Sequence, residues 1–391
     1  MIVRQFINWV KTAPAGERAE ATRALARAWL VSDLSDDDRT AAEGALLMLL
    51  DDASPLVRRA MAEVFARSAE APAGIVQALS LDQPSVALPI LEHSPLLIDA
   101  DLVDIVATGG SETQCAIARR MCLPASVCAA IAEVGTASAA LELIENAYAE
   151  LAPFSWDRIV ERHGHLAAIR ESMLVLEDLP AATRVALVAK LSDTLAQFVV
   201  ARNWLSADRA ERIAGEARDR STINIAASSQ GEDMRGLIAH LRATSQLTAG
   251  LILRALLSGN LELFEAALAE LSGLPRGRVS ALLLDRGEAS LVAVLKRAGL
   301  PESTFAAFRA ALEVIHETGF VDTLGGAARL RRRMVERVLT HCEADENAAG
   351  PLLILLRRFA TESAREEARL FCEELAAEDA VEPVPYGLIA A

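Results

Sequence analysis

The spacing of apolar residues predicts helices throughout the chain, and residues 49–66 show the pattern most clearly. Apolar residues recur there at i, i+4, i+7 and i+8, which is the period of one buried helix face. These positions are Val57, Met61, Val64 and Phe65. Ser54 is suited to cap the start of this helix, and Pro55 to occupy its first position, where the missing N–H costs no hydrogen bond. The stretch predicts one helix of a short helical repeat.

The same turn chemistry recurs along the first half of the chain. The segment that begins at Asp52 (DASPLV) is echoed at Asp82 (DQPSV), about thirty residues later, and further helix starts follow Gly110 and Gly135. Partner helices are expected between these starts. Pairs of short helices at a regular spacing are typical of solenoids, because one pair cannot bury its own apolar face. The sequence therefore predicts an all-α fold, and more specifically an α-solenoid of helical hairpin repeats.

Two longer helices are expected next, followed by shorter ones. The first should span Leu179 to Asn203, with its apolar stripe at Leu187, Val188, Leu191, Leu195, Phe198 and Val199. The second should run towards Ile225, and the segment Ser228–Asp233 is the best candidate for a linker. Beyond it, a Gly-Leu-Pro triplet occurs at Gly273 and again at Gly299, 26 residues later. In each triplet Gly is expected to end one helix in a left-handed conformation, and Pro to start the next.

These features divide the chain into three predicted parts. Residues 1–227 should form amino-terminal helical repeats, and residues 237–375 a set of stacked short helices. Two terminal helices, Pro351–Phe359 and Ser363–Leu375, should close that second set as a cap. Residues 376–391 contain two prolines and no helical stripe, so a flexible tail is expected there.

Composition narrows the classes of function. The 391 residues are 52% hydrophobic but only 4% aromatic, and the formal charge is −15. An acidic surface repels nucleic acid and anionic lipid, so neither is expected as a general partner. The longest stretch without a charged residue is twelve residues, too short to cross a bilayer, and no secretory signal is recognisable. Five cysteines without a CxxC pair favour reduced thiols, so a cytoplasmic protein is expected.

Candidate catalytic and metal motifs are weak. The triplet Asp36–Asp38 fits compensation of a helix dipole better than a cation site. His163 and His165 flank a glycine without a cysteine or carboxylate at ligand spacing, which favours a polar helix corner over metal binding. A glycine-rich phosphate loop, a nucleophile elbow and an HExxH motif are all absent from the sequence. We therefore expect neither a catalytic residue nor a cofactor.

Arginine clusters are the candidate interaction surface. The first group recurs at similar repeat positions and comprises Arg58, Arg59, Arg119 and Arg120. It could line a groove that grips carboxylates, or form a salt-bridge ladder with Asp51, Asp52 and Asp82; we prefer the ladder. The second group comprises Arg329, Arg331, Arg332, Arg333 and Arg337. With the negative charge of Glu336 included, the nine residues 329–337 have a net charge of +4. This helix face could dock on an anionic surface, or it could simply be solvated; we prefer the solvated face.

Several segments resemble a known bacterial family. They include Ala24–Ser35, the stretch 49–66, Val86–Leu97 and the region Leu256–Pro301. These segments are similar to HEAT-like repeat proteins, common in alphaproteobacteria, that are known only as a domain of unknown function. The resemblance extends over nearly the whole chain and implies a cytosolic all-α protein of HEAT-like hairpin repeats. It implies no activity and no catalytic residues.

The expected function is a non-enzymatic scaffold or regulatory adaptor for protein–protein interaction, because stacked helices offer an extended binding surface. The acidic balance of the chain suggests a partner protein of basic character. Two alternatives stay open. One is an enzyme on a HEAT-like scaffold, and the other is binding to an anionic surface through the Arg329–Arg337 helix.

Overall fold

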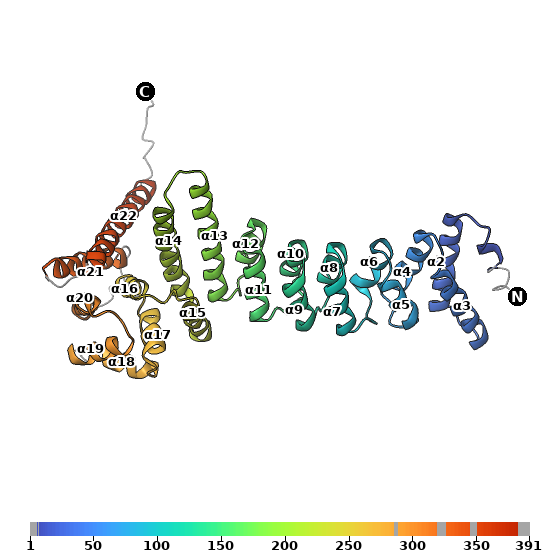
Figure 1. Ribbon diagram of the computed structural model, residues 1–391, viewed down its shortest axis with the longest axis horizontal. Coiled ribbons are helices and arrows are strands. Elements are labelled where there is room, and N and C mark those ends of the chain that lie inside the picture. Colours follow the sequence, from blue (N-terminus) through green and yellow to red (C-terminus); the bar gives the residue numbers. More distant parts are fainter. Residues whose placement is uncertain (1–5, 7, 285–287, 319–325, 345–349, 382–391) are drawn as a thin grey trace, which may run out of the picture. The chain divides into compact units, whose positions relative to one another are not determined.

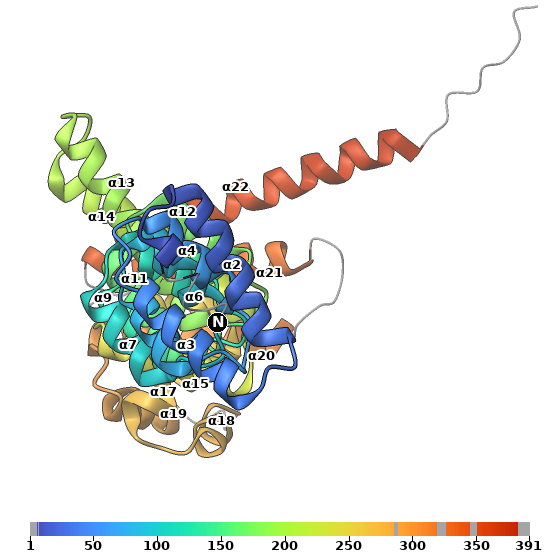
Figure 2. The same cartoon turned by 90° about the vertical axis from the view of Figure 1, so that its right-hand side faces the viewer.

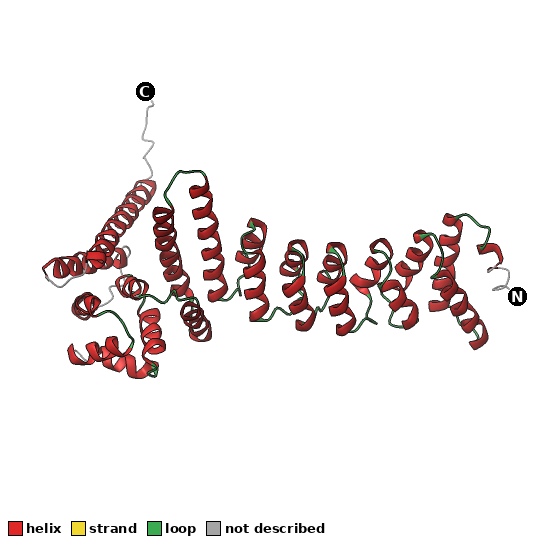
Figure 3. Ribbon diagram, in the orientation of Figure 1, coloured by secondary structure: helices red, strands yellow, loops and turns green. Residues whose placement is uncertain are grey.

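Every regular element of the computed structural model is helical among the residues it describes (Figures 1 and 3). Those residues are 6, 8–284, 288–318, 326–344 and 350–381, and the side chains of 288, 318, 326–329, 374 and 377–381 are not among them. Within these ranges no strand occurs, and Leu123 and Ala149 form an isolated bridge. The predicted all-α class is confirmed.

The chain separates into two compact units, Met1–Leu179 and Pro180–Ala391. This division differs from the predicted one, which placed the boundary at Ser228–Asp233. Ile223 and Met234, on either side of that segment, belong to one hydrophobic core. A short polar turn inside a continuous core looks like a linker in the sequence, because local composition does not report tertiary packing.

Unit 1 consists of short helices in two rows (Figure 1). One row contains α2 (Ala15–Val31), α4 (Pro55–Phe65), α6 (Pro84–His93), α8 (Ser111–Ala118), α10 (Ala137–Glu145) and α12 (Ala167–Leu174). The other contains α3 (Asp36–Leu49), α5 (Ala73–Ser80), α7 (Asp99–Thr108), α9 (Ala125–Val134) and α11 (Pro153–His163). In the first row each helix packs against the next from α2 to α12, and in the second α7 packs against α9 and α9 against α11.

Proline starts several of these helices, as the sequence indicates. Pro55 and Pro84 occupy the first turns of α4 and α6. Val57, Met61 and Phe65 of α4 are completely buried, which confirms its predicted inner face. The expected cap of α4 is different, however. The Ser54 side chain makes no capping bond, and its backbone N–H donates instead to Asp52 at 2.8 Å.

Unit 2 begins with two long helices and continues with shorter ones. Its elements are α13 (Ala181–Ala201), α14 (Ala207–Ser228), α15 (Gly231–Ala243), α16 (Ala249–Leu257), α17 (Leu261–Ser272), α18 (Arg276–Leu284), α19 (Glu288–Arg297), η1 (Glu302–Thr304), α20 (Phe305–Thr318), α21 (Gly326–Ala344) and α22 (Gly350–Val381). Phe264 and Phe308 stack in its core with their centroids 5.9 Å apart. Gly273 and Gly299 have φ of +68° and +71°, the left-handed conformation that their triplets predict.

The carboxyl-terminal helix is longer than predicted. Instead of two helices that end at Leu375, α22 is one helix of 32 residues that continues to Val381. Neither glycine nor proline lies between Phe359 and Ser363, so nothing in the local sequence interrupts it. The predicted tail of residues 376–391 therefore begins within a helix, and residues 382–391 lie outside the described part of the chain. Of the helices that are described, none is both long and apolar enough to cross a bilayer.

Candidate functional site

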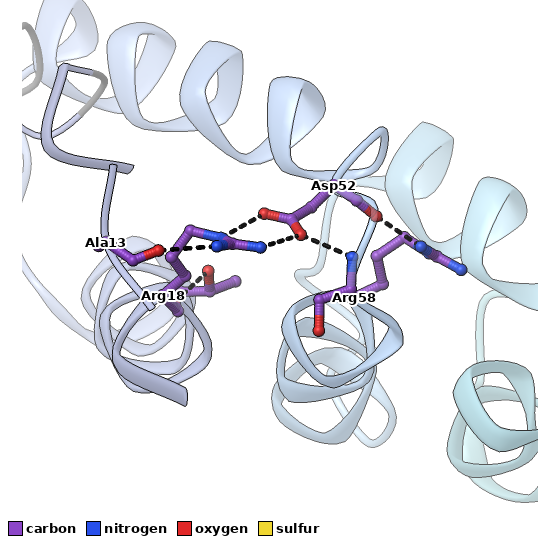
Figure 4. A network of polar contacts seen from close by, with 6 residues as sticks. Ala13, Arg18, Asp52 and Arg58 are labelled. Atoms are coloured by element: carbon purple, nitrogen blue, oxygen red, sulfur yellow. Dashed lines mark hydrogen bonds and ion pairs between the residues drawn. The ribbon is translucent and has the colours of Figure 1, made fainter. Parts of the chain in front are cut away.

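Arginines join neighbouring helices of the first row of unit 1 (Figure 4). Arg18 of α2 donates from Nε and Nη2 to both oxygens of Asp52, at 2.8 Å each, and from Nη1 to the carbonyl of Ala13. Arg58 of α4 repeats the arrangement one step later. Its Nε and Nη2 donate to Asp82 at 2.6 and 2.9 Å, and its Nη1 donates to the carbonyl of Asp52. Each guanidinium therefore binds the loop before its own helix and the aspartate before the next helix of the row.

These pairs shift the ionisation of the aspartates. The hydrogen bonds from Arg58 lower the pKa of Asp82 below its usual value, against the opposing effect of burial. Burial alone would raise the pKa of Asp52, but the bonds from Arg18 and from the Ser54 N–H outweigh it, and the pKa is lowered. Both carboxylates are thus held in the charged form by their arginines.

The other predicted arginines of unit 1 also have internal partners. Arg59 pairs with Glu63 on the same helix at 2.9 Å, and Arg119 binds Glu142 through Nε and Nη2. Arg120 donates to the carbonyls of Leu91 and Ser94 at 2.6 Å each, and burial lowers its pKa. The predicted ladder is present only in part. Arg58 binds the predicted Asp82, and Arg119 bridges to the next helix of the row through Glu142 instead of an aspartate, whereas Arg59 and Arg120 bind no predicted aspartate.

Most arginines of α21 are paired in the same way. Arg331 donates to Glu366 at 2.6 Å, Arg332 bridges Glu336 and Glu367, and Arg337 binds Glu317. Arg333 is exposed, and the side chain of Arg329 lies outside the described residues. The +4 cluster of the sequence is therefore largely neutralised by glutamates of α20, α21 and α22.

His163 takes part in a helix corner. Its Nε2 lies 3.3 Å from the carbonyl oxygen of Gly135, and burial lowers its pKa. Across the described part of the chain, no group of three histidine, cysteine or acidic side chains is placed to hold a metal ion.

The α13–α14 hairpin carries an apolar stripe that unit 2 leaves uncovered. Figure 2 shows the tip of this hairpin projecting away from α17–α19 of the same unit. The base of the hairpin joins the core through Ala181, Val185, Ile223 and Ala226. Along the outer part, Leu191, Leu195 and Phe198 are 37%, 54% and 45% exposed, whereas Leu187 is buried. The predicted stripe of this helix therefore splits into a buried part and an exposed part.

The tip of the hairpin is an aromatic cluster. Phe198 and Trp204 meet edge to face with centroids 5.7 Å apart. The Arg202 guanidinium lies 4.6 Å from the Phe198 ring centre and 5.7 Å from that of Trp204. Trp204 and Ile213 are also exposed. Aromatic and arginine side chains together are the composition of binding hot spots, and these three hold one another in place.

The hairpin also differs in charge from the rest of the protein. Residues 181–228 contain seven basic and five acidic side chains, a net charge of +2 in a chain of −15. Arg218 ties α14 to α13 through Asp193 at 2.7 Å, and it also pairs with Glu211 on its own helix at 2.5 Å. Within the described structure, Arg209 and Arg212 make no ion pair, so the outer part of the hairpin presents free positive charge. We call Val188, Leu191, Leu195, Phe198, Trp204 and Ile213 the hairpin surface.

One comparison with known proteins identifies the family. A family model described as an uncharacterised protein conserved in bacteria (DUF2336) matches residues 86–346, about two thirds of the chain. The chain belongs to the DUF2336 family. The DUF2336 match contains the whole α13–α14 hairpin, but it leaves out Ala24–Ser35 and residues 49–66, where part of the sequence resemblance lay. A search of curated proteins and a search of solved structures each found no match.

Proposed function

We propose that this DUF2336 protein is a non-enzymatic protein-interaction scaffold that docks an amphipathic helix of a partner protein on the hairpin surface. Unit 1, in this proposal, is an α-solenoid of HEAT-like hairpins. The observation that supports docking is the exposed apolar stripe at Leu191, Leu195 and Phe198. Soluble proteins rarely leave such a row uncovered unless a partner covers it.

The spacing of the stripe favours a helix as the partner. With Val188, the stripe has intervals of three, four and three residues, the spacing of a seam between two packed helices. From Val188 to Phe198 the seam is roughly 15 Å long at the rise of an α-helix. The exposed parts of the hairpin-surface side chains amount to on the order of 500 Å², enough for one partner's share of a modest interface.

The charges around the hairpin surface favour an acidic partner. Arg202 lies against Phe198 and Trp204, Arg209 and Arg212 are in the first turns of α14, and a partner helix with acidic flanks would complement these charges. This partner differs from the basic one suggested by the overall charge of −15, because the hairpin has the opposite sign to the rest of the chain.

The repeat architecture supports the solenoid part of the proposal. Neighbouring helices pack in sequence from α2 to α12, and the bridges made by Arg18 and Arg58 recur from one helix of the row to the next. We place the scaffold in the cytoplasm, with support from the odd number of cysteines in the sequence and the lack of a CxxC pair.

The alternative of an anionic surface bound by the Arg329–Arg337 helix has less support. Arg331, Arg332 and Arg337 already make ion pairs with glutamates, so binding phosphate groups there would break those pairs. The exposed aromatic tip has no such competing contact.

A photo-crosslinking amino acid tests the docking proposal in the cells that produce the protein. At position 195 it should give an adduct with one other protein, and Phe198→Ala with Trp204→Ala should abolish that adduct. The control position is Leu81, which is 77% exposed on unit 1 and should give no such adduct. Adducts with lipid alone, with a second copy of the chain alone, or equally from both positions would contradict the proposal.

A further inference from the structure

Unit 2 contains a second feature, unrelated to the hairpin surface: a pocket of about 450 Å³. Its lining comes from α14, α16, α21 and α22, together with the turn before α17 and the first residues of that helix. Its lining includes Ile223, Arg254, Asn260, Arg331, Phe359 and Glu362.

Arg254, which lines this pocket, lies in an otherwise apolar helix segment. It is the single charged residue of 251–257, and only 7% of its surface is exposed. Its guanidinium lies 4.1 Å from the Phe359 ring centre, and its Nη1 donates to Glu362 at 2.7 Å. Arginine is rarely buried to this extent unless it is paired, and here its partners are a carboxylate and an aromatic ring.

Arg254 and Arg331 each have an Nε atom without an acceptor among the described residues. In unit 1, Arg18, Arg58 and Arg119 each bind a carboxylate with the Nε and Nη2 pair, the edge that matches two carboxylate oxygens. Arg254 and Arg331 instead use Nη1 for Glu362 and Glu366. Their Nε atoms are buried and bonded to no other described residue.

Asn260 adds a third buried donor to the same pocket. Its Oδ1 accepts the backbone N–H of Leu263 at 3.0 Å as the cap of α17, and its Nδ2 is buried without an acceptor among the described residues. Three buried N–H donors without an acceptor among the described residues, from α16, from α21 and from the start of α17, therefore belong to residues that line one cavity. Buried donors without acceptors are unfavourable, so the pocket is suited to a ligand that brings oxygen atoms.

The charges of the lining decide which oxygen ligand fits. Three arginines (Arg220, Arg254 and Arg331) face three glutamates (Glu262, Glu362 and Glu366), so the walls balance. A balanced pocket tolerates a singly charged carboxylate better than a doubly charged phosphate. Ile223, Leu257 and Phe359 supply an apolar wall for the rest of the ligand.

We propose that this pocket binds a small organic acid, with its carboxylate held by Arg254, Arg331 and Asn260 and its apolar body against Ile223, Leu257 and Phe359. The site does not depend on the hairpin surface, so either proposal can fail without the other.

A titration of the full chain with butyrate, hexanoate and benzoate tests this site. Ligand-observed NMR and calorimetry measure the binding. The variant Arg331→Lys keeps the charge and removes the planar edge, and Asn260→Ala removes the third donor. We expect each to weaken carboxylate binding by about tenfold or more. The control Arg332→Lys, on the next residue and outside the lining, should change binding less than about twofold.

Three results would overturn the assignment: no binding of any of the three acids at up to about 10 mM, equal binding by Arg331→Lys and the unmodified protein, or phosphate displacing the acids. Circular dichroism and thermal melting of each variant establish that it is folded. If Asn260→Ala unfolds unit 2, Arg331→Lys with its neighbouring control still decides the question.

Discussion

Replacing Asp82 with asparagine tests whether the arginine bridges stabilise unit 1. Asp82 accepts two hydrogen bonds from Arg58 and one from the backbone N–H of Gln83 at 2.7 Å. The side chains of Arg58 and Asp82 are 16% and 17% exposed, so the pair is largely withdrawn from water. Asp82→Asn keeps the size of the side chain and one acceptor oxygen, but removes the charge.

The expected loss follows from the contacts. A hydrogen bond to a charged group contributes about 1.5–3 kcal/mol, and breaking a fully buried ion pair costs about 3–5 kcal/mol. The pair is partly exposed and asparagine retains one neutral bond, so we expect a loss of about 1–3 kcal/mol at neutral pH. An exposed ion pair would contribute less than about 1 kcal/mol, and the two cases are therefore distinguishable.

The pH dependence gives a second criterion. Arg58 lowers the pKa of Asp82 in the folded protein. The stabilisation is therefore fully present above the unfolded pKa of about 3.9 and is lost as the pH falls through the lower folded value. The difference between the unmodified protein and Asp82→Asn should be largest at neutral pH and should shrink below about pH 4.

Urea unfolding of the full chain, with hydrogen exchange read over α4–α6, measures the effect where it arises. The matched control is Asp51→Asn, because Asp51 is exposed and makes no ion pair with any other described residue. Equal losses in the two variants, or a loss for Asp82→Asn that is the same at pH 7 and pH 3, would show that the bridge does not carry this stability.

Three further predictions follow from single residues. Burial raises the pKa of Asp219 in spite of the attraction of nearby arginines, so its charged form lowers stability once the pH exceeds the pKa of Asp219 in the unfolded chain. Asp219→Asn should therefore raise the melting temperature at pH 7 but not near pH 3. A lower melting temperature at pH 7 would contradict this. Gly273→Ala should lower the free energy of unfolding in urea by about 1–2 kcal/mol, because φ at Gly273 is +68°. The control Gly277→Ala, inside α18, should not lower it. Equal effects of the two substitutions would refute the backbone argument. Burial raises the pKa of Cys128 to about 11, so iodoacetamide at pH 8 should modify the exposed Cys122 and leave Cys128 unmodified by mass spectrometry, and comparable labelling would contradict its burial.

The sequence predicted local structure well where chain-breaking residues determine it. Pro55 and Pro84 start helices, and Gly273 and Gly299 end them, because proline and glycine act through their own backbone geometry. The predicted boundary at Ser228–Asp233 lies inside unit 2, and only the shared core of Ile223 and Met234 shows that the chain continues as one unit there.

The candidate sites were harder to predict because they depend on what covers each face. The stripe from Leu187 to Phe198 is apolar throughout, and its sequence does not indicate that unit 2 covers only part of it. Arg331 was predicted to lie on a solvated helix face. In the structure it donates a hydrogen bond to Glu366, which is 35 residues later in the sequence, and this contact cannot be read from the local pattern. Arg254 was missed although the sequence held a usable signal, namely a lone charge inside the apolar run 251–257.

The bridges of unit 1 have a mechanical consequence. Arg18 and Arg58 each fasten one helix of the row to the loop just ahead of the next, so these polar links join neighbouring helices. A row of helices whose polar links join neighbours can stretch and twist through small rotations between adjacent helices, and these rotations add up along the row. Under a pulling force these fasteners should open one at a time, and unit 1 should lengthen in steps of about one helical hairpin.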